Sequence, residues 1–136
     1  MAVRFNRRVY NSIITEVRQQ VVRETEAVKT EAIRLTFLPK HGNVHVYEDR
    51  IHVASAPGEP YANDTGNANS LITTKVFFDN TKIEGKINFG AEYHADLEFG
   101  TQKMEPRPTA RPALENRRED AVKNIREAVN RGIRKA

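Results

Sequence analysis

The apolar residues of the first forty positions recur at the spacing of one helix face. Steps of three, four and seven residues separate Val9, Ile13, Val17, Val21, Val28, Ala32 and Leu35. This spacing predicts an amphipathic helix over residues 1–38, with Asn6 or Ser12 as its cap and Leu38-Pro39 as its end. Thirty helical residues would span about 45 Å. We therefore expect the helix either to kink or to project beyond the core towards a partner.

The pattern changes over residues 42–90, where strand-like alternation predicts a small antiparallel β-sheet. Apolar and polar residues alternate over 44–48. Residues 55–70 are rich in Pro, Gly, Asn, Asp and Ser, so we interpret them as a loop. Beyond this loop, residues 71–79 and 82–89 form a predicted hairpin.

Residues 93–112 combine a compact aromatic-acidic turn, ending at Gly100, with a stiff arm. The arm carries prolines and arginines in close succession, namely Pro106, Arg107, Pro108, Arg111 and Pro112. Proline fixes φ and pushes the preceding residue towards extended geometry, so the arm loses little conformational entropy on binding. We interpret it as an assembly element that docks on a neighbour, and not as an active site.

A second amphipathic helix is predicted over residues 112–134. Its apolar face consists of Leu114, Ala121, Val122, Ile125, Ala128, Val129 and Ile133. Pro112 is tolerated in the first turn of a helix. Glu119 with Lys123 and Glu127 with Arg131 have the spacing of favourable ion pairs on one helix. The sequence therefore predicts a single α+β domain over residues 1–136, with a long N-terminal helix, a small antiparallel sheet and a C-terminal helix.

Charge is unevenly distributed along this chain of 136 residues with a net charge of +4. Residues 1–40 hold eight Lys or Arg against four Asp or Glu, residues 41–100 four against nine, and residues 101–136 ten against five. Basic ends favour nucleic-acid binding as one interpretation. The other is that both basic segments are helices with solvated faces, since each also carries spaced glutamates.

Several kinds of catalytic or metal chemistry find no support in the sequence. The chain has no cysteine, which excludes a disulfide framework and a Cys-ligated metal site. It shows no signal peptide and no membrane-spanning run. The four histidines, at positions 41, 45, 52 and 94, lack the spacing of a metal motif, so we expect no metal and no cofactor.

Two groups of carboxylates have the residue types of catalytic acids and bases. Asp64-Thr65-Gly66 matches the triplet of aspartic peptidases, but those enzymes need a second aspartate to share the proton, and no second copy of the triplet exists. The second group consists of Glu92, Asp96 and Glu98, whose spacing would allow two of them to act as a general acid and a general base. The same spacing is equally expected of carboxylates that face solvent or pair with an arginine. We therefore expect a protein that is not an enzyme.

Two ordered motifs resemble one protein family. The first is Ser55-Ala56-Pro57-Gly58-Glu59-Pro60, which continues with Asp64-Thr65-Gly66 and Ser70-Leu71. The second runs from Tyr93 to Leu114 and contains Glu98-Phe99-Gly100-Thr101, Lys103-Met104, Arg107-Pro108 and Arg111-Pro112-Ala113-Leu114. In order, in separation and in their flanking helices they resemble the small head–tail joining, or tail-completion, proteins of long-tailed bacteriophages. The chain departs from that pattern at Ala68 and Thr109, where a large apolar residue and an aromatic residue are common.

The resemblance implies a structural virion protein that forms a ring at the head–tail joint, as a neck, tail-completion or tail-terminator protein. A closed ring uses a head-to-tail interface between different patches of adjacent subunits. The implied partners are further copies of the chain, as a hexamer or dodecamer, and the neighbouring head-closure, connector and tail-tube proteins. Viral DNA would pass through without specific binding, and no membrane is involved. The implied location is the virion neck, assembled in the cytoplasm of the bacterial host.

The resemblance also implies which residues contact a neighbour. The predicted interface residues are Leu97, Glu98, Phe99, Lys103, Met104, Arg107, Pro108 and Arg111, and the loop motif contributes Pro57, Gly58, Glu59, Asp64, Thr65 and Gly66. We expect the two arginines to donate to carboxylates of the next subunit, with Glu92, Asp96 and Glu98 as candidates. Because a surface ion pair contributes only about 0–1 kcal/mol, the apolar side chains should supply most of the binding. We expect acidic strands to line the hole of the ring.

The alternative function is that of a small bacterial DNA-binding accessory protein. The basic ends favour it, but proteins that bind single strands interleave basic residues with exposed aromatic rings. Here the aromatic residues lie mainly in the acidic middle of the chain. The two functions predict different behaviour, because a ring is defined by its mass and a DNA complex by its sensitivity to salt.

Overall fold

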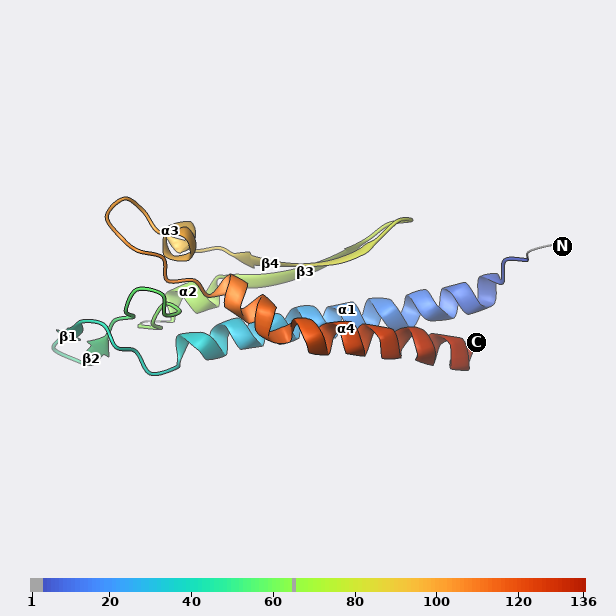
Figure 1. The fold of residues 1–136 in the computed structure, drawn as a ribbon, viewed down its shortest axis with the longest axis horizontal. Coiled ribbons are helices and arrows are strands. Elements are labelled where there is room, and N and C mark those ends of the chain that lie inside the picture. The colour runs from blue at the N-terminus through green and yellow to red at the C-terminus, as the bar shows by residue number, and fades with distance from the viewer. Residues whose placement is uncertain (1–3, 65) are drawn as a thin grey trace.

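An elongated pair of antiparallel helices dominates the molecule, which is described here by a computed structural model (Figure 1). The structure describes residues 4–64 and 66–136, so Thr65 of the loop motif lies outside the described residues. Its elements are α1 (Arg7–Thr36), β1 (Val44–Val46), β2 (Ile51–Val53), α2 (Asn67–Ser70), β3 (Ile72–Phe78), β4 (Ile83–Phe89), α3 (His94–Phe99) and α4 (Ala110–Lys135).

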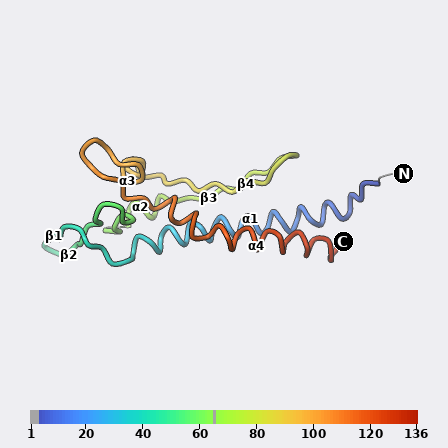
Figure 2. Tube along the Cα trace, viewed as in Figure 1, coloured from blue at the N-terminus to red at the C-terminus, as the bar shows by residue number. Residues whose placement is uncertain are grey.

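The two ends of the molecule differ in construction. The start of α1 and the end of α4 lie together at one end, and the trace in Figure 2 follows both helices along the long axis. The β3–β4 hairpin runs beside α1, while β1, β2, α2, α3 and the arm gather at the opposite end. The fold is therefore a helix pair with a hairpin along it and irregular structure at one end.

The start and end of α1 follow from local chemistry. The Asn6 side chain accepts a hydrogen bond from the Val9 amide at 3.2 Å and so caps the helix. Ser12, the other candidate cap, instead donates its hydroxyl proton to the Gly132 carbonyl of α4 at 2.7 Å. At the other end the Lys40 ammonium donates to the Leu35 carbonyl at 2.8 Å, and its partial burial lowers its pKa.

The hydrophobic core is small and lies where the C-terminal half of α1 meets the beginning of α4. It consists of Val28, Ala32, Leu35 and Ala113, with Ile87 and Phe89 of β4 packed against it. The β3–β4 register pairs Ile72 with Phe89 and Thr74 with Ile87, so alternate residues face α1. Val76 pairs with Gly85, and the absence of a side chain at Gly85 lets β4 lie directly on Thr25.

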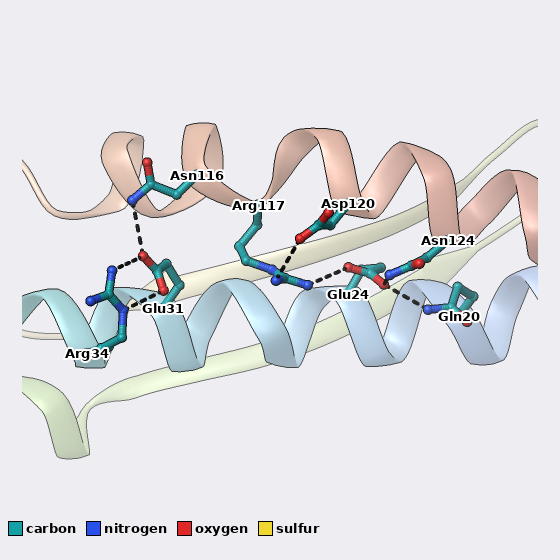
Figure 3. Close-up of polar contacts among 8 residues, drawn as sticks. All are labelled: Gln20, Glu24, Glu31, Arg34, Asn116, Arg117, Asp120 and Asn124. Carbon is teal, nitrogen blue, oxygen red and sulfur yellow. Dashed lines mark hydrogen bonds and ion pairs between the residues drawn. The ribbon is translucent and has the colours of Figure 1, made fainter.

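The contact between α1 and α4 is polar along much of its length (Figure 3). Asn124 and Gln20 both donate to one oxygen of Glu24 at 2.8 Å, and Arg117 lies 3.6 Å from the other oxygen. Asn116 donates to Glu31 at 3.1 Å. Towards the termini the buried Glu16 accepts from Lys135 at 2.7 Å. Buried charges are tolerated only when they are paired, so these contacts fix how the two helices align.

The sequence predictions of the fold are largely confirmed. The chain is α+β, with a long N-terminal helix and a C-terminal helix, and α4 begins at Ala110, slightly earlier than predicted. The strands form two separate two-stranded sheets. The loop over residues 55–70 ends in the short helix α2, and the aromatic-acidic turn contains α3.

Two details of the helix predictions are wrong. In the first half of α1 the most buried side chains are polar, namely Glu16, Gln20 and Glu24, because α4 offers them partners. Neither predicted ion pair along α4 forms among the described residues: Glu119 and Lys123 are not paired, and Arg131 contacts α1 in place of Glu127, donating to Gln20 at 3.0 Å. Within the described ranges 4–64 and 66–136, no helix has both the length and the apolar character needed to cross a membrane.

Gly85→Ala should destabilise the fold, because a Cβ atom at this position would lie 1.9 Å from the Thr25 hydroxyl oxygen. We expect a loss of about 1–3 kcal/mol in the free energy of unfolding, as for other overpacked sites. Chemical denaturation followed by circular dichroism measures it. Thr25→Ala combined with Gly85→Ala should recover part of the loss, and Lys86→Ala is the control. Equal stability of Gly85→Ala and the native chain would contradict this packing.

Candidate functional site

The arm folds back on its own chain after a reversal at Gly100. Gly100 has a φ of 76°, and a Cβ atom there would lie 2.8 Å from the Met104 carbonyl oxygen. The Thr101 amide donates to that same carbonyl at 2.8 Å, which closes the turn. The chain then returns alongside α3, where the Arg107 amide donates to the Leu97 carbonyl at 2.6 Å. Glycine is therefore required at this reversal both for its backbone conformation and for the close approach.

Glu98 caps the start of α4. Its carboxylate accepts from the amides of Thr109 at 2.8 Å, Ala110 at 3.0 Å and Arg111 at 3.0 Å. The next residue, Pro112, has no amide proton, and the Ala113 amide already donates to the Thr109 carbonyl. One buried side chain thus satisfies the free donors of the first turn and places negative charge at the positive end of the helix.

The His94 ring lies beside the Glu98 carboxylate and packs against two aromatic rings. The His94 ring stacks on Phe89 with centroids 4.2 Å apart and meets the edge of Tyr61 at 5.9 Å. Its Nε2 atom lies 3.8 Å from Glu98 and has no hydrogen-bond partner among the described residues. Burial lowers the pKa of His94 and raises the pKa of the Tyr61 phenol to about 12. The site therefore favours a neutral histidine beside the carboxylate.

The two sequence motifs meet in space. The Gly58 amide donates to the Pro106 carbonyl at 2.9 Å, and Arg107 Nε donates to the Ser55 carbonyl at 3.1 Å. The fully buried Thr109 accepts from the Tyr61 amide through its hydroxyl at 3.3 Å. Thr109 stands where the resembled family commonly has an aromatic residue, and here its hydroxyl is used inside the fold.

Glu59 holds the first loop motif together. Its carboxylate accepts from the amides of Ala56 at 2.9 Å and His41 at 3.1 Å, and it also contacts the His41 ring. Together these contacts lower the pKa of Glu59 to about 2, and the hydrogen bond from the Ala56 amide contributes most. Gly58, with a φ of 83°, allows the turn that brings the Glu59 carboxylate back to the Ala56 amide.

Asp64 fixes the end of the loop to the β1–β2 hairpin. Arg50 reaches its two oxygens with Nε at 2.8 Å and Nη2 at 3.0 Å, and His52 lies 3.5 Å away. The guanidinium lowers the pKa of Asp64 below its usual range. Gly66, with a φ of 81°, then begins α2. No group of three or more His, Asp or Glu side chains within the described residues is arranged to hold a metal ion.

The predicted interface residues fall into two sets. Glu98 and Arg107 make contacts inside their own chain: Glu98 accepts from the start of α4, and Arg107 donates to the Ser55 carbonyl. Phe99, with 80% of its surface exposed, and Lys103 and Arg111 remain accessible. Partly buried members of the set are Leu97, Met104 and Pro108, and in the loop Pro57 is exposed.

A shallow cavity of about 380 Å³ lies between the two motifs. Leu97, Tyr93 and Arg107 line it on the arm side, and His45 and His52 line it on the hairpin side. The two histidine rings stack with centroids 6.4 Å apart. The sequence did not predict this meeting, although alternation along the hairpin places His45 and His52 on one face once their register is known.

Comparison with known proteins gives no match: no family model, no curated protein and no solved structure matches this chain. The likeness to the phage family therefore rests on the sequence motifs alone.

Replacing Glu98 by Ala should destabilise the fold by about 1–3 kcal/mol, because it leaves three amides at the start of α4 without an acceptor. Urea denaturation measures the change, and hydrogen exchange at Ala110 and Arg111 should become faster. Glu115→Ala removes an exposed carboxylate from the same helix and is the control. An unchanged midpoint for Glu98→Ala would contradict its role as the cap.

Glu59 should make stability depend on pH in the acidic range. Its pKa is about 2 in the fold and 4.5 ordinarily, so its carboxylate stabilises the folded state above pH 4.5. This stabilisation is lost as the pH falls towards 2. The melting temperature of Glu59→Gln should therefore lie below that of the native chain at neutral pH and approach it near pH 2. A constant difference over this range would contradict the assignment.

Proposed function

We propose that this chain is a structural subunit that assembles with further copies into a ring at the head–tail joint of a bacteriophage. Two things support the proposal: the ordered pair of motifs in the sequence, and a monomer whose surface greatly exceeds that of a compact protein. The resemblance supplies the setting in the virion, and the excess surface supports assembly in general.

The excess of surface is the observation that carries the proposal. The chain exposes 9687 Å² at a mass of 15.5 kDa. A compact monomer of this mass exposes about 7,200 Å². The difference of roughly 2,500 Å² is more than the ~1,600 Å² that two interfaces of standard size would cover on a ring subunit. The excess surface is thus enough for interfaces with two neighbouring subunits and with one further partner.

Exposed apolar side chains indicate where this surface would be covered. Several of them lie in elements at the end opposite the chain termini, where Phe99 is 80% exposed and Val46 77% exposed, and Phe5 near the N-terminus is also 72% exposed. Phe37, at the end of α1, is 65% exposed. Large exposed apolar groups near one another are typical of surfaces that bind other proteins. We assign contacts with adjacent subunits or neck proteins to this end of the molecule.

The arm enters the proposal in a modified form. Arg107 is used to hold the first loop motif, so the accessible part of the arm is its outer edge, with Phe99, Lys103 and Arg111. Among the described residues, the ion-pair partner of Arg111 is the exposed Glu115 on its own helix, at 3.4 Å. Because such exposed pairs contribute little, Arg111 can exchange Glu115 for a carboxylate of a neighbour at small cost.

The strands do not have the acidic character expected of a channel lining. On the face of β3–β4 that is turned from α1, Lys75 and Lys86 lie opposite each other beside Phe77, with Glu84 as the acidic residue. The carboxylates of the middle segment lie mostly in loops and in α3. We therefore do not propose that acidic strands line the hole of the ring.

DNA binding is the competing function, and one observation favours it. The beginning of α1 and the end of α4 bring the two basic segments of the sequence to the same end of the molecule. A basic patch on adjacent helices is a common electrostatic footprint of nucleic-acid binding.

Light-scattering mass measurements with and without duplex DNA separate the two functions. We expect a discrete multiple of the chain mass that forms without DNA and appears as rings in negative-stain micrographs. The assembly should persist when salt is raised, since apolar contacts supply most of the binding. A chain that stays monomeric, and binds DNA with an affinity that falls steeply with salt, would contradict the proposal and support the alternative.

A further inference from the structure

The β1–β2 hairpin presents an apolar face that is largely exposed in the described part of the chain. The register pairs Val44 with Val53 and Val46 with Ile51, which places these four side chains on one face of the hairpin. Their exposed fractions are 61%, 36%, 77% and 71% in that order. The two histidines lie on the opposite face, towards the cavity. A two-stranded sheet with such a face is marginal alone, so burial of this face would stabilise it.

An apolar groove lies at the opposite end of the molecule. It is formed between the first half of α1 and the tip of the β3–β4 hairpin, with a volume of about 610 Å³. Ile14, Val17 and Val21 line one wall, and Phe78 and Ile83 line the other. The exposed face and the groove are therefore different patches on opposite ends of one chain, as a head-to-tail interface requires.

The charges of the two ends are complementary. At the groove end, residues 4–23 hold five arginines and one glutamate, and residues 118–136 hold six Lys or Arg against three Asp or Glu. At the hairpin end, residues 40–64 hold two basic against four acidic residues, and residues 91–105 hold one against four. An acidic end that meets a basic end sets the orientation of docking.

Each patch carries one charged residue that could pair with the other patch, Glu48 at the hairpin and Arg18 at the groove. Glu48 is exposed in the turn beside Val46 and Ile51, and it has no ion-pair partner among residues 4–64 and 66–136. At the groove, the Arg18 guanidinium lies 3.8 Å above the Phe78 ring and likewise has no carboxylate partner in the described chain. Glu48 and Arg18 are thus opposite charges beside apolar surface, each without an ion-pair partner among the described residues. The groove also contains Asp79, whose carboxylate accepts from the amides of Thr81 and Lys82.

We propose that the Val44, Val46, Ile51 and Val53 face of one copy docks in the α1–hairpin groove of the next copy, with Glu48 beside Arg18. This inference rests on the proposed function and names the two surfaces that join adjacent subunits. The apolar side chains supply the binding, and the two charged ends fix its direction.

Charge reversal tests the pairing. Glu48→Arg and Arg18→Glu should each weaken self-association at least about tenfold, because each places like charges together at the interface. The double variant carries both reversals and should restore association. Glu119→Arg and Arg126→Glu make the same changes of charge on an exposed face of α4 and should have no effect. Circular dichroism confirms that every variant is folded.

Chemical cross-linking tests the same contact without altering charge. The chain has no cysteine, so Val46→Cys combined with Asn80→Cys at the groove introduces the sole thiols. A short bis-maleimide should yield a series of covalent oligomers, whereas Val46→Cys with Arg126→Cys should yield none. If the native chain assembles normally, but charge reversal has no effect and no cross-links form, the pairing of these two surfaces is wrong and the proposed function is unaffected. A native chain that never assembles overturns the pairing and the proposed function together.

Discussion

The start of α4 depends on a carboxylate that lies 12 residues before its first residue, Ala110. Glu98 belongs to α3, yet it accepts from three consecutive amides at the first turn of α4. Because Pro112 lacks an amide proton, this one side chain completes the hydrogen bonding of the helix end. This contact ties α3, the reversal at Gly100 and the arm to the start of α4, and so fixes where the helix begins.

The helix pair that extends from this point has an unusual balance of forces. Its apolar core is confined to the half near Glu98, while the other half is aligned by hydrogen bonds from Arg, Lys and Asn of α4 to Glu16, Gln20 and Glu24. Polar contacts specify register but add little net stability after desolvation. Apolar side chains in the first half of α1 are therefore not all used in the contact with α4, and several of them line the groove beside the β3–β4 tip.

The fold was predictable from local patterns, and the site was not. Helical spacing in α1 and alternation in β3–β4 are strong signals because they repeat over many residues, and the cap at Asn6 is a local interaction. The two motifs drew attention to Glu98 and Arg107, but sequence could not show that both act within their own chain. That outcome depends on how α3 is placed against α4 and the loop, which no periodic pattern encodes. The pairing of Asp64 with Arg50 was unpredictable for the same reason, because the two residues are 14 positions apart and no periodic pattern links them.

The central claim is that the large exposed surface of this subunit is covered in an assembly, while the Glu98 cap and the arm stay within each chain. Electron cryomicroscopy of an assembled particle containing the chain tests it most directly. The account predicts that Val46 and Phe99 are covered by another chain and that Glu98 still contacts the start of α4. If Val46 and Phe99 face solvent in the assembled particle, or if the arm has left its own subunit, the account is contradicted.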